Sequence, residues 1–214
     1  MQFVSDLHLH SKYSRAVSQS MILPEMARWA KKKGIDILST GDWTHPLWIR
    51  EIRSQLEEKG EGLYGLKSEI RSTKSERDSG VASLPRMTQR EPLFLLSTEI
   101  ASIYKQGEKV RRIHNLIFAP SFETAEKINK ELTGRGCNLH SDGRPIIGLT
   151  SKELLEIILS IDNRAMLIPC HVWTPHFGIY GSASGFDSLE EAFGNLSSSV
   201  FGIETGLSSD PLMN

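Results

Sequence analysis

Short apolar runs alternate with amphipathic stretches along the chain, and this alternation restricts the fold more than any other feature. The runs typical of strands are residues 2–10, 35–40, 93–98, 113–119, 166–171 and 199–204. The stretches typical of helices are residues 24–33, 46–58, 121–132 and 151–160. Strands that alternate with helices favour a parallel α/β architecture. We therefore predict an α/β fold with about six strands.

A polar stretch at residues 67–91, rich in Ser, Arg and Lys, interrupts this pattern and is typical of a surface insertion. The whole chain has 214 residues, which suits one domain with a sizeable core. No linker or internal repeat divides the sequence, so we predict a single domain over residues 1–214. The formal net charge is -1, so contacts with nucleic acid would have to come from local patches.

Cysteine usage and hydropathy both bear on the compartment. The two cysteines, Cys137 and Cys170, are too few for a disulfide framework and are typical of a reducing environment. The N-terminus lacks the pattern of a secretory signal, and no apolar run is long enough to span a bilayer. We therefore predict a cytoplasmic protein with no membrane partner.

Several potential metal ligands lie at or near predicted strands. His8 and His10 are two residues apart on a strand, so they share one face and can chelate one ion, although two surface histidines would give the same pattern. Asp42 follows a strand and could instead be a loop cap. Glu99 ends an apolar run, where a carboxylate needs a partner, a metal or access to solvent.

Two further histidines become informative only together with these residues. His114 and His171 lie beside apolar runs, and each alone would be assigned to the core. The carboxyl ends of strands in a β/α barrel converge on one mouth, and His114 is the exception because it comes early in its strand. Imidazole and carboxylate ligands suit transition metals, and a cluster with a bridging carboxylate can activate water and neutralise a phosphate oxygen.

Five short motifs resemble those of the PHP (polymerase and histidinol phosphatase) superfamily. They are residues 6–11 (DLHLHS), 40–42 (TGD), 98–100 (TEI), 113–115 (IHN) and 170–175 (CHVWTP). The second motif departs from the pattern, because Asp42 stands where the superfamily has a histidine. The resemblance implies an irregular PHP-type β/α barrel with two or three divalent ions (Zn, Mn or Mg). The catalytic and metal-binding residues that it implies are His8, His10, Asp42, Glu99, His114 and His171.

Four longer segments are similar to the endonuclease Q branch of the superfamily. They are residues 110–120, 141–146, 185–188 and 203–211. This similarity implies a metal-dependent phosphodiesterase of DNA repair. Such an enzyme nicks DNA next to deaminated bases (uracil, hypoxanthine or xanthine) or abasic sites, and DNA containing such lesions is the expected partner.

The sequence departs from the family pattern at two places where further metal ligands are expected. Residues 15–17 (RAV) offer no ligand where many members have one, which bears on a third metal. The last motif of the family contains Asp-x-His, which supplies two further ligands and would follow Asn214. We therefore expect a C-terminally truncated chain whose barrel is incomplete.

Basic and aromatic side chains near the motifs are candidates for contacts with DNA. Lys109, Arg111 and Arg112 lead into His114 and could bind backbone phosphates, or could simply be a solvated hairpin. Trp173 could stack on an extruded base or pack its own loop.

Two other functions remain open. One is a phosphatase of a small phosphomonoester, similar to histidinol phosphatase. The other is a non-catalytic remnant that binds metal or DNA without cleaving it.

Overall fold

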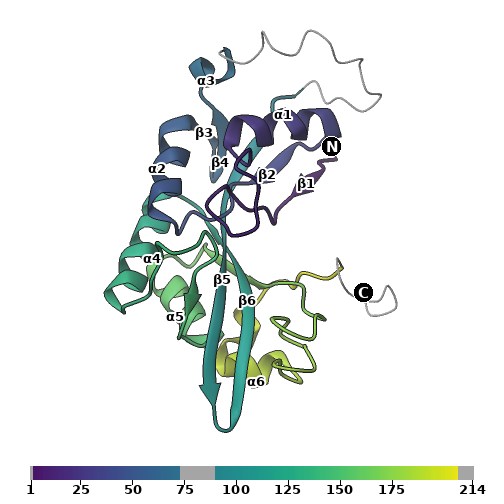
Figure 1. The fold of residues 1–214 in the computed structure, drawn as a ribbon, viewed down its shortest axis with the longest axis vertical. Coiled ribbons are helices and arrows are strands. Elements are labelled where there is room, and N and C mark those ends of the chain that lie inside the picture. Colours follow the sequence, from purple (N-terminus) through teal and green to yellow (C-terminus); the bar gives the residue numbers. More distant parts are fainter. Residues whose placement is uncertain (1, 73–89, 207–214) are drawn as a thin grey trace.

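The computed structural model describes residues 2–72 and 90–206 (Figure 1). Most of the predicted insertion at residues 67–91, and the C-terminal segment 207–214, lie outside the described residues. The strands are β1 (Ser5–Asp6), β2 (Ile37–Ser39), β3 (Leu56–Gly60), β4 (Leu63–Leu66), β5 (Leu93–Gln106), β6 (Lys109–Ala119), β7 (Ile146–Ile147) and β8 (Met166–Pro169). The helices are α1 (Leu23–Lys33), α2 (Pro46–Gln55), α3 (Ser68–Ser72), α4 (Phe122–Gly134), α5 (Ser151–Ile161) and α6 (Leu189–Phe193).

The strands form one curled sheet, a half-barrel, around the long strand β5 (Figure 1). β1 and β2 run parallel to each other, and β2 runs parallel to the start of β5. β4 pairs with the same part of β5 in the antiparallel sense and continues the sheet into β3. The predicted α/β class is confirmed, with eight strands in the described part of the chain where about six were expected.

β5 and β6 form a long antiparallel hairpin that differs from the prediction. The register runs without a break from Leu96 opposite Ala119 to Gln106 opposite Lys109. Gly107, with φ of 59°, allows the tight turn at the tip. Glu99 therefore lies inside a strand rather than at its end, and residues 113–119 belong to an antiparallel strand. β7 extends this part of the sheet beside β5, and β8 extends it beside β6.

Three other predicted elements were wrong in their extent. The predicted strand 2–10 is reduced to β1, because the backbone N–H of Ser11 bonds the Asp42 carboxylate and the chain leaves the sheet. The predicted helix 46–58 ends at Gln55, because Leu56 is buried opposite Leu66 in a hairpin. Residues 199–204 form no strand, although Glu204 bonds the Pro169 carbonyl through its backbone N–H.

The core lies between the sheet and the helices that follow its strands. α5 buries Leu154, Leu155 and Ile158 on one face, at the spacing expected of an amphipathic helix. The indole N–H of Trp48 on α2 donates to the Gly41 carbonyl, 2.9 Å away, and anchors the loop after β2. No helix in residues 2–72 or 90–206 has both the length and the apolar character needed to cross a membrane.

Candidate metal centre

Loops and strands of the half-barrel bring five of the six predicted ligands into one cavity of about 430 Å³. Its lining residues are His8, His10, Glu99, His114, Arg144, His171, Thr174, His176 and Phe177. The five come from both parts of the sheet, since the loop after β1, the middle of β5 and β6, and the loop after β8 each contribute. Asp42, the sixth, lies just outside the cavity.

Glu99 is the centre of this cluster, and its two carboxylate oxygens face different histidines. Oε2 lies 3.6 Å from His8 Nε2 and 3.3 Å from His10 Nε2. Oε1 lies 2.5 Å from His114 Nδ1 and 3.4 Å from His171 Nε2. A carboxylate between two pairs of imidazoles has the arrangement of a bridging ligand between two ions.

The histidines at the start of the chain are each oriented by a second carboxylate. Glu204 Oε1 lies 2.8 Å from His8 Nδ1, and Asp42 Oδ1 lies 3.1 Å from His10 Nδ1. A carboxylate on Nδ1 favours the tautomer in which Nδ1 carries the proton and the Nε2 lone pair is available for a metal. Both Nε2 atoms face Glu99, so the second carboxylates prepare both rings for coordination.

The donor set fits divalent metal ions. His8, His10 and Glu99 form one group whose ligand atoms all lie within 4.8 Å of one another, and Glu99, His114 and His171 form another. His8 Nε2 and His114 Nδ1 are buried, and each faces only the Glu99 carboxylate, at 3.6 Å and 2.5 Å, without a well-aligned hydrogen bond. A buried polar atom without a partner is costly, and coordination would satisfy both nitrogens.

The charges of the cluster are strongly coupled. Burial alone would lower the pKa of His8, but the hydrogen bond with Glu204 and the nearby Glu99 carboxylate outweigh it and raise the pKa to about 10. Burial alone would raise the pKa of Glu99, but the close imidazoles of His114, His171 and His8 hold it well below its usual range. The carboxylate is therefore anionic and the cluster already accommodates positive charge at its centre.

Cys170 forms a third possible group with His8 and Glu204. Its side chain is fully buried, and burial raises the pKa of the thiol well above its ordinary value. A thiol coordinates metal as the thiolate, so this environment opposes coordination. The geometry favours Cys170 as a packing residue beside the site.

The surroundings of Asp42 favour a role in orienting His10 rather than in binding a metal directly. Its Oδ2 accepts hydrogen bonds from the Ser11 backbone N–H at 2.6 Å, the Ser11 hydroxyl at 2.7 Å and the Ser14 hydroxyl at 2.9 Å. Its side chain is fully buried, and it is absent from the three groups of potential ligands in the described residues. Both oxygens are thus engaged with protein atoms, and Asp42 contacts the cluster through His10.

Two glycines allow the close approach of loops around Asp42. A Cβ atom on Gly41 would lie 2.2 Å from the Leu9 carbonyl oxygen, and Gly41 has φ of 62°. A Cβ atom on Gly143 would lie 2.5 Å from Asp42 Oδ2 and 2.5 Å from Ser14 Oγ. Gly41 thus allows the loop after β2 to approach the Leu9 backbone, and Gly143 allows its own loop to approach the Asp42 carboxylate.

The four candidates for contacts with DNA are placed differently from one another. Lys109 is exposed at the hairpin tip and Arg112 is half-buried on β6. Arg111 is buried and bonds Glu191 on α6, so binding of a phosphate would break this ion pair. Trp173 lies outside the metal cavity, with its ring 5.1 Å from that of Tyr180. His176 and Phe177, a few residues further along the chain, line the cavity instead.

Two functional candidates were missed from the sequence. Glu204 orients His8 and also accepts the His171 backbone N–H at 2.8 Å. Its position after the apolar residues 200–203 is the same pattern that singled out Glu99, and it could have been found in this way. Arg144 lies in a loop with no pattern that points to the cavity it lines.

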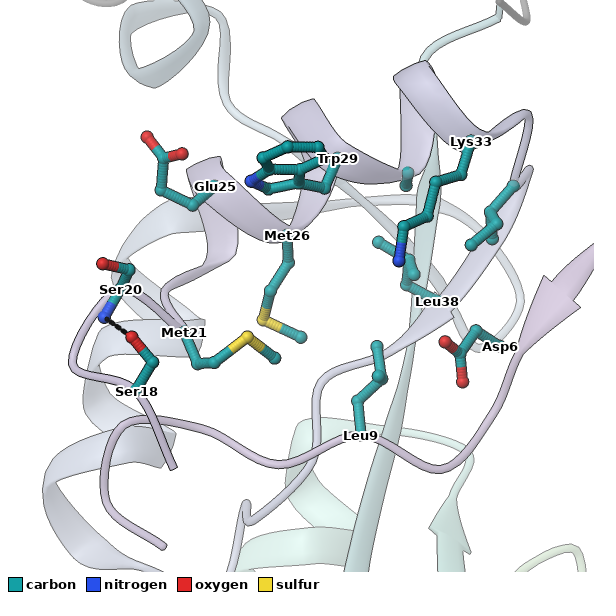
Figure 2. Close-up of a pocket in the computed structure, with 12 residues that line it drawn as sticks. Asp6, Leu9, Ser18, Ser20, Met21, Glu25, Met26, Trp29, Lys33 and Leu38 are labelled. Atoms are coloured by element: carbon teal, nitrogen blue, oxygen red, sulfur yellow. Dashed lines mark hydrogen bonds between the residues drawn. The ribbon is translucent and has the colours of Figure 1, made fainter. Parts of the chain in front are cut away.

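A second cavity, of about 330 Å³, lies beneath α1 on the outer side of β1 and β2 (Figure 2). Met21 and Met26 line its interior, and Trp29, Asp6 and Lys33 surround it. Leu9 lines it as well, between His8 and His10 in the chain, but none of the metal-cluster residues lines this cavity. Its apolar character suits packing or a small apolar group rather than catalysis.

Comparisons with known proteins find similar structures, although no family model matches the chain. One similar structure is endonuclease Q in complex with a 27-mer duplex substrate with an abasic lesion at the active site. The TM-score is 0.73 at 28% identity, over 96% of this chain and 43% of that one. Another is the lesion-specific endonuclease PfuEndoQ from Pyrococcus furiosus, with a TM-score of 0.73 at 27% identity, over 96% and 42%.

Two curated relatives have no assigned activity. An uncharacterised protein of Methanocaldococcus jannaschii is 26% identical over 170 residues, which are 79% of this chain and 16% of the relative. The uncharacterised protein YqxK of Bacillus subtilis is 27% identical over 219 residues, or 96% of this chain and 49% of the relative. The chain thus spans less than half the length of these relatives and of the similar structures. Its fold is similar to that of part of endonuclease Q.

Proposed function

We propose that the chain carries the metal centre of a phosphodiesterase that nicks DNA beside a damaged base or an abasic site. The observation that carries the proposal is the position of Glu99 between two pairs of histidines. The similarity to endonuclease Q, solved with an abasic duplex, supports DNA as the substrate. Deaminated bases are the second class of lesion that we propose, from the resemblance in sequence.

The metal ligands in this proposal are His8, His10, Glu99, His114 and His171. Divalent ions held there would supply activation of water and neutralisation of charge at the phosphoryl group. Asp42 and Glu204 act through His10 and His8, which they hold in the coordinating tautomer. We thus propose a positioning role for Asp42 in place of direct coordination.

Arg144 is the residue that we assign to the phosphate itself. It lines the same cavity as the five ligands, and one Nη atom donates to the Arg15 carbonyl at 3.1 Å. A guanidinium has five N–H donors, so further donors are available for phosphoryl oxygens. The interaction would orient the diester over the cluster and stabilise negative charge that develops there.

A nicking assay tests the function. Labelled duplexes carry one abasic site, one uracil or one hypoxanthine, and Mn²⁺, Mg²⁺ or Zn²⁺ is added in turn. We expect cleavage beside the lesion by the wild-type chain and loss of cleavage in Glu99→Ala, whose metal content also falls. The same assay, on the chain extended by any residues that follow Asn214 in its gene, tests the predicted truncation.

The outcomes separate the alternatives. Turnover of a small phosphomonoester without nicking would favour the phosphatase. Metal binding without either activity, in the extended chain as well, would favour the non-catalytic remnant. Unchanged metal stoichiometry in both His10→Ala and Glu99→Ala would contradict the proposed centre itself.

A further inference from the structure

The face of the β5–β6 hairpin that carries the metal cluster also carries two cations. Side chains directly opposite in an antiparallel pair share a face, and alternate residues along a strand return to it. Lys105 lies opposite Val110, and Val110, Arg112 and His114 are alternate residues of β6. Lys105 is likewise an even number of residues from Glu99 on β5. Arg112 and Lys105 thus continue the face of the cluster toward the tip.

The cations on the opposite face have a different environment. Lys109 and Arg111 alternate with Arg112 and face the other way. Arg111 packs on the Phe186 ring, 3.9 Å from its centroid, and pairs with Glu191 at 3.0 Å. Lys109 is exposed, as Lys105 is, and it lies only one register pair away. Lys109 therefore provides a matched control for Lys105.

Apolar side chains lie among the cations of the cluster face. Ile146 on β7 is opposite Ala101 of β5, and its side chain is 63% exposed. Phe177 lies against His114, with ring centroids 4.4 Å apart. Arg144 lines the cavity beside them. This mixture of cations and exposed apolar groups complements the phosphates and sugars of a polynucleotide.

The hairpin is also placed to reach beyond the active site. Its tip projects past α5 and α6 (Figure 1). Lys105 lies six positions after Glu99, which corresponds to about 20 Å along a strand. One strand of DNA rises about 3.4 Å per nucleotide, so Lys105 would meet phosphates about six nucleotides from the cluster.

We propose that this face of the hairpin binds the sugar–phosphate backbone of DNA on one side of the cleaved bond. Arg112 contacts a phosphate near the cluster and Lys105 contacts one near the hairpin tip. The inference rests on the proposed function, because it takes DNA as the substrate. It gives the two cations a binding role that is independent of the sequence of the DNA.

The test measures affinity for a labelled duplex with one abasic site by fluorescence anisotropy, between about 50 and 200 mM salt. Loss of two phosphate contacts should make the slope of log affinity against log salt shallower by roughly 1.8. We expect this change in Lys105→Ala/Arg112→Ala, whereas Lys109→Ala should retain the wild-type slope. Metal content and melting temperature of each variant control for folding.

Duplexes of different arm lengths locate the contact. Lys105→Ala should weaken binding only when the duplex extends more than about six nucleotides from the lesion on one side. Shortening that arm to about three nucleotides should remove the difference from wild type. If Lys105→Ala and Lys109→Ala weaken DNA affinity equally at every arm length, the cations act only through the overall charge of the hairpin, and the proposal is overturned.

The same samples distinguish failure of the proposed DNA-binding face from failure of the proposed function. If the protein nicks DNA but the double variant and Lys109→Ala have the same salt dependence of DNA affinity, the proposed function stands and the DNA-binding role of the hairpin face is refuted. If the double variant has a shallower salt slope but the wild-type protein nicks no lesion, the DNA-binding face is supported and the proposed nuclease function is refuted.

Discussion

His10 Nδ1 lies 3.1 Å from Asp42 Oδ1, and the opposite edge of the ring faces Glu99. The contact joins the loop after β1 to the loop after β2. It holds one imidazole between a buried carboxylate and the centre of the cluster. The position of Asp42 consequently determines whether His10 can coordinate an ion.

Gly143→Ala should disturb the site through Asp42. The new Cβ would lie 2.5 Å from Asp42 Oδ2 and 2.5 Å from Ser14 Oγ, so the carboxylate or its loop has to move. Such overpacking costs about 1–3 kcal/mol of stability, and we expect weaker metal binding as well. Gly148→Ala is the control, because no atom lies within 4 Å of the added methyl group. Equal metal affinity and equal stability of the two variants would contradict this account of Asp42.

Glu204→Gln should weaken metal binding without unfolding the protein. The amide keeps the shape of the side chain but removes the anionic partner of His8 Nδ1. Loss of such a partner of a coordinating histidine typically lowers metal affinity about 10–100-fold. Titration with Zn²⁺ or Mn²⁺ measures the effect, and Glu156→Gln, on the exposed side of α5, should match the wild type. An unchanged metal affinity would show that Glu204 does not orient His8 for coordination.

Thr150→Ala should destabilise the fold at a distance from the cluster. Thr150 and Glu153 form a reciprocal capping box at the start of α5. Loss of the cap costs about 1 kcal/mol, which lowers the melting temperature by about 2–4 °C in a chain of this size. Thr150→Ser retains the hydroxyl and should recover most of the loss. A melting temperature that is unchanged in Thr150→Ala would show that α5 does not depend on its cap.

Asp162→Asn should destabilise the protein in a pH-dependent way. Hydrogen bonds from Arg164 hold the pKa of Asp162 below its ordinary value, and the Thr124 hydroxyl donates to the same carboxylate at 2.8 Å. A lowered pKa in the folded state stabilises the fold above the unfolded pKa of about 3.9 and loses this effect as the pH falls further. Denaturant unfolding should therefore show the largest difference from wild type near pH 7. A difference that stays constant below pH 4 would refute the linkage.

His8 and His10 were predicted from their spacing on one strand, and Glu99, His114 and His171 from the apolar runs beside them together with the PHP resemblance. The structure gathers these residues in one cavity. The path of the backbone between them was harder to predict. The apolar run at residues 93–98 continues through alternating residues to Gln106, so a single long strand was taken for a short one. Leu56 was assigned to a helix because helical periodicity alone cannot reveal its partner Leu66.

The hairpin register also limited the prediction of DNA contacts. Lys109, Arg111 and Arg112 are neighbours in sequence, but successive residues of a strand face opposite sides. The predicted strand began at residue 113, so the sequence analysis could not place Arg112 on the face of His114, and only the turn at Gly107 brings Lys105 of β5 to the same face. The burial of Arg111 against α6 likewise depends on a contact between segments about 80 residues apart.

The contact between His8 and Glu204 joins residues 196 positions apart, almost from one end of the described chain to the other. Contacts of such long range form only after the intervening chain has been ordered, because closing the loop costs entropy. During synthesis, His8 and His10 emerge long before the residue that orients His8. In the proposed metal centre, full affinity would therefore be acquired only when residue 204 has left the ribosome and docked, and metal uptake would serve as a kinetic marker for completion of the fold.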